Sequence, residues 1–378
     1  MNHQPRIAIV CDFLATMGGA ENVVLALHRI FPDAPIYTAI YNPKKVPAFD
    51  GLDVRTSSLQ KLPGWLRKYN KLFPTMAVKA MRKLDLSEFD IIITSSYLHG
   101  HQVTKTRSNQ VVINYCHTPP RYYWSHYEEY LKDPGYGKLN PLVRFLMPLL
   151  VPRQRKLDLE AAKQVDIFIA NSTETQRRIK QFYDRPATVV HPPVSTNRFT
   201  PSKERGDHYV TIGRQLPYKR YDLAVAAATK LGKKLLVFGS GPAHGTLEKL
   251  AGPTIEFRTD RFGDASDAEY EKAITTARGF IYAAEEDFGI VTVEALAAGT
   301  PVIGFGKAGT LDIVQDGESG VLFTEQTVDA VAEAINKREQ LTFHPSDLQR
   351  KAKRFDEGLF ATKIRKLVSD VAQQIRTK

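Results

Sequence analysis

Short, uninterrupted apolar runs recur along this chain, and helical patterns separate several of them. A short apolar run that leads through a turn into a helix is typical of a strand buried on both faces of a parallel sheet. The sequence therefore predicts an α/β protein built from successive strand and helix units. The predicted strands are residues 6–11, 36–40, 91–95, 111–115, 167–171 and 188–191, and then residues 209–212, 235–238, 255–257, 280–283 and 301–304.

A proline-rich joint divides the chain into two halves. The 378 residues exceed what one hydrophobic core comfortably supports, so we expect two domains. Pro192 and Pro193 follow a predicted strand and precede a polar stretch over residues 195–208, which is typical of a linker. We therefore expect one α/β domain over residues 1–192 and a second that begins at residue 193.

Basic residues are concentrated in the first half. The chain carries a net charge of +11. Residues 1–190 contain 26 Lys and Arg against 16 Asp and Glu, whereas residues 191–378 contain 26 against 25. A basic half can face nucleic acid, an anionic membrane or a phosphorylated ligand, and the sign of the charge does not choose among them.

Cysteine usage and hydropathy narrow the class of protein. Cys11 and Cys116 each lie within an apolar run, so we expect no disulfide framework and a reducing compartment. Asp12 interrupts the apolar stretch near the N-terminus, which argues against a signal peptide or an anchor. No run of about twenty apolar residues occurs, so we expect no bilayer-spanning segment.

Two segments of the first half, residues 61–83 and 138–156, interleave basic residues with large apolar ones. A segment of this kind can lie on an anionic membrane surface. The alternative is that both are ordinary helices whose apolar sides pack inward. Pro141, Pro148 and Pro152 argue against one long helix in the second segment.

Candidate ligand-binding residues of the first half follow two predicted strands. Gly18 and Gly19 follow the first strand and open a helix, where backbone amides can approach an anion. Their spacing is not the G-x-G-x-x-G of dinucleotide sites, and a turn that needs positive φ is the alternative. His117 directly follows another strand, at the end where open α/β sheets place ligand contacts. A purely structural histidine is the alternative there.

The second half holds two cations and two carboxylates of interest. Arg214 and Lys219 lie in the loop after its first strand, where fixed cations can hold a diphosphate. Glu286 and Glu294 are eight positions apart, and Gly289 between them makes a continuous helix unlikely. We expect Glu286 in a loop and Glu294 in the first turns of a helix, with both facing one crevice. The alternatives are two solvated cations and a helix with an acidic first turn.

Two of these motifs together resemble the family 4 glycosyltransferases of the GT-B fold. GRQLPYKR over residues 213–220 is similar to that family's diphosphate-binding motif, and EDFGIVTVE over residues 286–294 is similar to its Glu-x7-Glu motif. CHTPPRYYW and EEDFGIVTVEALAAGTPVIGFG resemble bacterial O-antigen mannosyltransferases within the family. The resemblance implies two Rossmann-like, doubly wound domains that face a central cleft. It also implies that residues 1–192 bind the acceptor, that residues 193–355 bind the nucleotide sugar, and that residues 356–378 form a helix packing back on the first domain.

The resemblance implies a role for each matching residue. Arg214 and Lys219 bind and stabilise the donor diphosphate. Glu286 binds sugar hydroxyls, Glu294 binds the ribose, and His117 lies by the reacting sugar carbon. Backbone contacts to the sugar, the phosphates or the acceptor are implied for Gly18, Gly19, Phe288, Gly289, Gly309 and Thr310.

The resemblance implies a retaining transferase that moves a hexose, best matched by mannose from GDP-mannose, to a lipid-linked glycan precursor. We expect it in the cytoplasm, at the inner face of the membrane and held there by its basic half. Family members lack a metal site, and no Asp-x-Asp occurs in a plausible loop, so we expect metal independence and no other cofactor. The alternatives are a UDP-hexose transferase, a GT-B sugar-nucleotide epimerase and a basic nucleic-acid-binding protein. No nucleic-acid-binding module accompanies the charge, so nucleic acid is not an expected partner.

Overall fold

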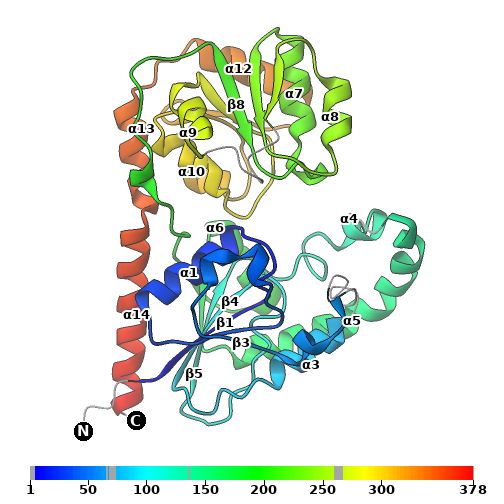
Figure 1. The fold of residues 1–378 in the computed structure, drawn as a ribbon, viewed down its shortest axis with the longest axis vertical. Helices are drawn as coiled ribbons and strands as arrows, with labels where there is room; N and C mark the ends of the chain where they lie inside the picture. Colours follow the sequence, from blue (N-terminus) through cyan, green and yellow to red (C-terminus); the bar gives the residue numbers. More distant parts are fainter. Residues whose placement is uncertain (1–4, 65–66, 68–73, 135–136, 259–266, 378) are drawn as a thin grey trace. The chain divides into compact units, whose positions relative to one another are not determined.

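The computed structural model describes residues 5–64, 67, 74–134, 137–258 and 267–377. The chain forms two compact units (Figure 1). Unit 1 comprises Met1–Pro192 together with Phe360–Lys378, and unit 2 comprises Pro193–Leu359. The first division falls at the predicted proline-rich joint. Each unit is built around one parallel sheet.

Unit 1 contains a seven-stranded parallel sheet in the order β3-β2-β1-β4-β5-β6-β7. Along β1, Ala8 and Val10 lie in one core cluster, whereas Ile9 and Cys11 lie in another. Side chains alternate between the faces of a strand, so both faces of the sheet are covered. The strands are β1 (Ile7–Cys11), β2 (Ile36–Thr38), β3 (Val54–Thr56), β4 (Ile91–Ser96), β5 (Val111–Cys116), β6 (Ile167–Ala170) and β7 (Ala187–Val189).

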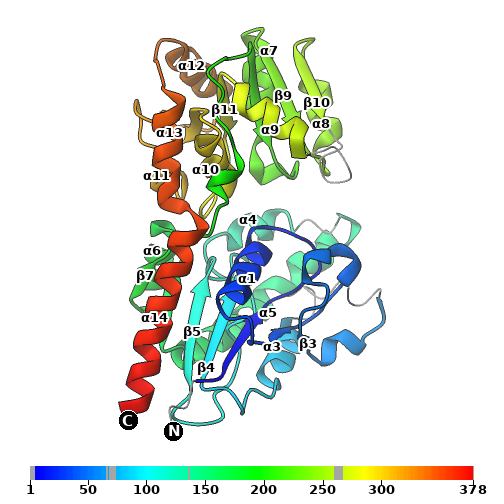
Figure 2. The same ribbon diagram turned by 60° about the vertical axis from the view of Figure 1, so that its left-hand side comes forward.

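Helices from distant parts of the sequence cover the two faces of this sheet. Helix α14 runs along unit 1 in both ribbon views (Figures 1 and 2), and its Phe360 packs against Tyr115 of β5 with ring centroids 5.8 Å apart. Helix α1 contributes to the same cluster, and α3, α5 and α6 contribute to the opposite one. Their bounds are α1 (Gly19–Ile30), α3 (Pro74–Arg82), α4 (Tyr127–Lys132), α5 (Asn140–Gln164), α6 (Thr173–Tyr183) and α14 (Glu357–Thr377).

Unit 2 contains a six-stranded parallel sheet in the order β10-β9-β8-β11-β12-β13. Helices α9, α10 and α13 contribute to one core cluster, and α7, α8 and α12 contribute to the other. The strands are β8 (His208–Ile212), β9 (Lys234–Phe238), β10 (Ile255–Arg258), β11 (Gly279–Tyr282), β12 (Val302–Phe305) and β13 (Gly320–Phe323). The helices are α7 (Tyr221–Lys230), α8 (His244–Leu250), α9 (Asp267–Thr276), α10 (Ile290–Ala297), α11 (Thr310–Ile313), α12 (Val328–Glu339) and α13 (Pro345–Ala352).

The long helix α5 corrects one prediction from sequence. Its 25 residues form one helix although Pro148 and Pro152 lie inside it. Each proline removes the amide that would bond to the carbonyl four residues earlier, on Arg144 or Pro148. Both of those residues are exposed, so water can bond to their carbonyl groups. The prolines therefore do not end the helix.

The strand order creates a topological switch point in each sheet. In unit 1 the chain moves outward from β1 to β3 and then returns to place β4 on the other side of β1. In unit 2 it moves outward from β8 to β10 and returns with β11 beside β8. In open α/β sheets the crevice at the carboxyl ends of such neighbouring strands is the usual ligand site. None of the helices in the described residues is both long enough and apolar enough to cross a membrane.

Candidate active site

Two of the predicted residues of unit 2, Lys219 and Glu286, meet at its switch point. Arg214 and Lys219 lie in the loop after β8, and Glu286 lies in the loop after β11. The side chains of Lys219 and Glu286 form an ion pair, and each is 17% exposed. The alternative that Arg214 and Lys219 are two solvated cations is therefore wrong for Lys219. Arg214 is exposed, and no ion pair to it is seen in the part of the chain that the structure describes.

Tyr282 is a member of this cluster that the sequence did not indicate. It is the last residue of β11, is buried, and donates its hydroxyl to the Glu286 carboxylate. Burial and the nearby Glu286 charge raise the pKa of Tyr282 well above its ordinary value. Its hydroxyl therefore stays protonated and remains a donor to Glu286 at any physiological pH.

The loops after β11 and β12 are in close contact. The Gly309 amide donates to the Glu286 carbonyl at 2.9 Å, and a Cβ at Gly309 would lie 2.2 Å from the Phe288 Cα. Gly289 has a φ of +93°, which L side chains rarely adopt, and it precedes α10. The Phe288 ring packs in the core against Phe355, which leaves its backbone as the part that can meet a ligand. Thr310 begins α11 directly after this contact.

Glu294 lies in α10, as the sequence predicted, and Glu286 lies in the preceding loop. The first turn of α10 contains no acidic residue, so the alternative of an acidic helix start is wrong. Glu294 is partly buried, and Tyr270 donates its hydroxyl to it at 3.3 Å. Gln215 was missed by sequence reasoning. It is fully buried, donates to the Gly239 carbonyl at 2.7 Å, and ties the loops after β8 and β9 together.

At the switch point of unit 1, the buried Asp12 organises the loop after β4. Its carboxylate accepts backbone amides from four consecutive residues, including Tyr97 at 2.7 Å and Gly100 at 2.6 Å. Burial raises the pKa of Asp12, whereas these amide bonds lower it. The sequence indicated Asp12 only as a break in an apolar run.

Gly18 and Gly19 lie at the start of α1 in unit 1. Gly18 has a φ of −168°, which is extended backbone that any residue adopts, and neither glycine has a positive φ. The alternative of a turn that needs positive φ is therefore wrong. A Cβ at Gly18 would lie 3.0 Å from a Glu21 carboxylate oxygen, so the side chain of Glu21 already occupies that space.

His117 is the first residue after β5 and is held by its neighbours. Its Nε2 lies 2.8 Å from the Ser95 hydroxyl, and its ring meets the edge of Tyr115 with centroids 5.3 Å apart. Burial lowers the pKa of His117 to about 4. At neutral pH the ring is therefore uncharged and acts through hydrogen bonds and not as a cation. No group of three or more metal-ligating side chains placed to hold a metal occurs in the described residues.

Two family models match the chain. The model described as Glycosyltransferase Family 4 matches residues 17–198, and the model described as Glycosyl transferases group 1 matches residues 195–355. A D-inositol 3-phosphate glycosyltransferase of Mycobacterium leprae is 28% identical over 211 residues, which is 49% of each chain. The corresponding protein of Mycobacterium bovis is 30% identical over 203 residues, 47% of this chain and 42% of that protein. The chain thus spans about half the length of the curated relatives it matches.

Solved structures match over nearly the whole chain. Anabaena HepE, in complex with UDP and glucose, is 16% identical, with 97% of this chain and 100% of that chain covered and a TM-score of 0.70. Sucrose-phosphate synthase from Thermosynechococcus elongatus is 16% identical, with 97% and 99% covered and a TM-score of 0.71. The two parallel-sheet, Rossmann-like units are those of the GT-B class of glycosyltransferase folds. The two family models together match residues 17–355, and the chain belongs to the family 4 glycosyltransferases.

Proposed function

We propose that this chain is a retaining, metal-independent hexosyltransferase that uses a nucleotide-sugar donor bound in unit 2. The observation that carries the proposal is the cluster of Lys219, Glu286 and Tyr282 at the switch point of unit 2. A cation beside a carboxylate offers complementary groups to a diphosphate and to the hydroxyls of the attached sugar. Arg214 supplies a second cation in the same loop.

The proposed chemistry needs charge stabilisation more than a strong base. As the bond from sugar to diphosphate breaks, negative charge grows on the diphosphate and is met by Arg214, Lys219 and the amides that begin α10. Glu286 holds the sugar, and Glu294 holds the ribose. The acceptor then attacks from the face that the diphosphate leaves, and a departing phosphate oxygen takes its proton. We assign acceptor binding to unit 1, where a neutral His117 orients a hydroxyl by hydrogen bonding.

Two nucleotide sugars are candidates for the donor. GDP-mannose is the first, because CHTPPRYYW and the long motif after β11 resemble O-antigen mannosyltransferases. A UDP-hexose is the second, because the Anabaena HepE structure carries UDP and glucose. We propose a lipid-linked glycan precursor as acceptor and a location at the inner face of the cytoplasmic membrane. The basic charge of residues 1–190 favours an anionic surface as the binding partner.

Thermal-shift screening against GDP, UDP and their hexose conjugates tests donor binding. A ligand that binds only the folded state raises the melting temperature of the protein. The increase grows with the ratio of ligand concentration to Kd. We expect one base to stabilise the chain clearly more than the other. No shift with any nucleotide sugar would contradict the proposal, whereas conversion of the donor to an isomer without an acceptor would indicate an epimerase. Turnover that survives EDTA is expected, and its loss would contradict metal independence.

A matched pair of arginine variants tests the diphosphate assignment. Arg214→Ala should lower kcat/KM by roughly 10²–10³-fold, the range seen when one preorganised charge-stabilising donor is lost. Arg350→Ala removes an exposed arginine elsewhere in unit 2 and should leave turnover unchanged. Circular dichroism and melting temperature should be the same for both variants. Near-normal turnover of Arg214→Ala would refute the assignment of that residue.

A further inference from the structure

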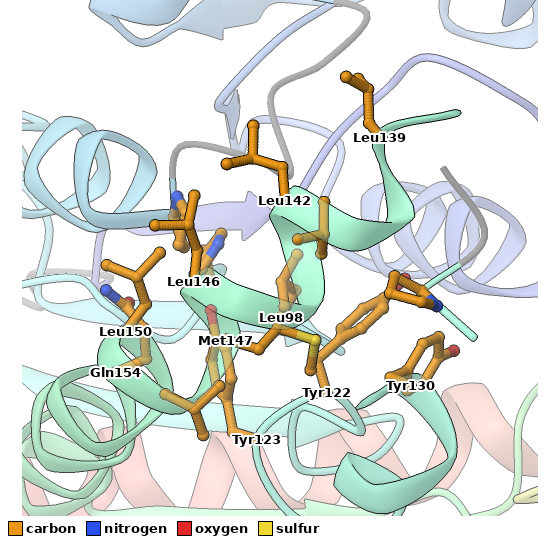
Figure 3. Close-up of a pocket in the computed structure, with 15 residues that line it drawn as sticks. Leu98, Tyr122, Tyr123, Tyr130, Leu139, Leu142, Leu146, Met147, Leu150 and Gln154 are labelled. Carbon is orange, nitrogen blue, oxygen red and sulfur yellow. The ribbon is translucent and has the colours of Figure 1, made fainter. Parts of the chain in front are cut away.

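Unit 1 contains an apolar pocket beside α5 that lies outside the proposed donor site. Its volume is about 260 Å³. Small-ligand sites span roughly 300–1,000 Å³, so this pocket is large enough for part of an extended ligand. Leu142, Leu146 and Leu150 of α5 line one side, and Tyr122 and Tyr130 lie across from them (Figure 3).

The first half of α5 is unusually exposed for an apolar segment. The buried residues of α5 begin at Val151, and none precedes it. Leu142 is 55% exposed and lines the pocket. Phe145 and Leu149 are 70% and 65% exposed and lie outside the pocket lining. A contiguous exposed apolar face of this kind marks an interaction surface, because monomeric soluble proteins rarely leave one uncovered.

The other half of α5 is fixed firmly, so the pocket has a rigid frame. Asp158 is fully buried and accepts hydrogen bonds from Trp124 at 2.7 Å and Tyr183 at 2.8 Å. Arg155 donates to the Tyr123 carbonyl at 2.6 Å, and its guanidinium lies 5.4 Å from the centre of the Trp124 ring. These bonds hold α5 to the segment that forms the opposite wall. The pocket is therefore preformed.

The charge on the exposed face of α5 favours an anionic bilayer over a second copy of the chain as its binding partner. Arg144, Arg153 and Lys156 are exposed, and residues 140–157 contain no acidic side chain. A second copy of the chain would bring a like-charged face against it, which is unfavourable. An anionic bilayer instead offers hydrocarbon to the leucines and phosphate groups to the cations. Phe145 and Leu149 also need hydrocarbon beyond what one ligand within the pocket can cover.

We propose that the exposed face of α5 docks on an anionic phospholipid bilayer and that one hydrocarbon chain of a phospholipid enters the pocket. This deepens the membrane location in the proposed function and rests on that part of it alone. It does not depend on which donor unit 2 binds. The described part of α3 behaves differently, because its Ala77, Val78 and Met81 pack inward. Residues 65–66 and 68–73 of the predicted membrane segment lie outside the described residues.

Two tryptophan variants of α5 distinguish entry of a hydrocarbon chain into the pocket from nonspecific binding to the membrane. Leu146→Trp fills the pocket, and Leu149→Trp adds the same bulk to an exposed position outside it. The full chain is mixed with vesicles of equimolar phosphatidylcholine and phosphatidylglycerol that carry a phospholipid with a photoreactive group at the end of one chain. After irradiation, peptides that cover residues 139–154 are measured by mass spectrometry. Pure phosphatidylcholine vesicles serve as the neutral comparison.

The wild type and Leu149→Trp should both be labelled in this region on anionic vesicles. Leu146→Trp should lose labelling by about tenfold or more, because loss of a few buried methylene contacts changes binding by that factor. Equal labelling of the two variants, or equal labelling on neutral and anionic vesicles, would overturn the proposal. A concentration-dependent dimer that hides this face would also overturn it. Nucleotide thermal shifts measured on the same samples report donor binding separately, so failure of one proposal is distinguishable from failure of the other.

Discussion

The contact between the loops after β11 and β12 makes Gly309→Ala a sharp test of the proposed site. The added Cβ would lie 2.2 Å from the Phe288 Cα, whereas ordinary contacts begin at 3.4 Å, so one backbone segment must move by about 1 Å. Overpacking costs about 1–3 kcal/mol, and we expect the upper end because the obstacle is backbone. For a unit of this size that lowers the melting temperature by about 6–12 °C. A shift of about 1 Å in the Glu286 loop should also lower turnover by about 100-fold.

Gly245→Ala is the matched control for this variant. Gly245 lies inside α8, and its added Cβ would meet nothing within 4 Å. Alanine is a better helix former than glycine by about 0.5–1 kcal/mol, so this variant should be as stable as the wild type or more so. Differential scanning calorimetry and initial rates compare the two variants directly. If Gly309→Ala matched Gly245→Ala in both measurements, the inferred loop contact would be refuted.

Three further predictions concern charge and hydrogen bonding. Lys219→Ala should weaken nucleoside-diphosphate binding by about 10-fold or more, because a hydrogen bond to a charged group is worth about 1.5–3 kcal/mol. Calorimetric titration measures the change in Kd. Tyr282→Phe keeps the ring and removes only the donor to Glu286, so it should lower kcat/KM for the nucleotide sugar while binding of the bare nucleotide stays within about threefold. Burial lowers the pKa of His117 to about 4 and that of His99 to about 3, against about 6.5 in the unfolded chain. The unfolded state thus binds more protons between these values, and the free energy of unfolding should fall from pH 7 to pH 4, by about 2 kcal/mol at pH 5 for His99 alone. Urea titrations at each pH test this, and a His99→Asn variant with an unchanged pH slope would contradict it.

The sequence predicted the central strands and two of the four edge strands, β7 and β10. Central strands are buried on both faces and therefore read as continuous apolar runs, as in β4. β3 and β13 lie at the outer edges of the two sheets, and neither was predicted. β3 has the sequence VRT and is largely exposed, so no apolar run marks it. The long α5 was missed for a different reason, because sequence alone did not show that Arg144 and Pro148, whose carbonyls lose an amide partner, are exposed residues.

The sequence predicted those residues of the candidate site that directly follow a strand. Lys219 and Glu286 each follow a strand, and the structure brings them together because β8 and β11 are neighbours. Tyr282 and Gln215 were not predictable, because their roles depend on which loops lie side by side. Asp12 shows the same limit, since its four amide partners come from a loop more than eighty positions away. Sheet order, which pattern alone does not supply, is the missing information in each case.

The ion pair of Lys219 with Glu286 has a consequence for product release. Each charge already has its partner, so a diphosphate must compete with Glu286 for Lys219. A nucleotide sugar compensates the displaced carboxylate with sugar hydroxyls, whereas a nucleoside diphosphate without its sugar does not. Under the proposed roles the spent nucleotide therefore holds Lys219 less well than the intact donor does. Re-formation of the pair then favours departure of the product and readies the site for the next donor.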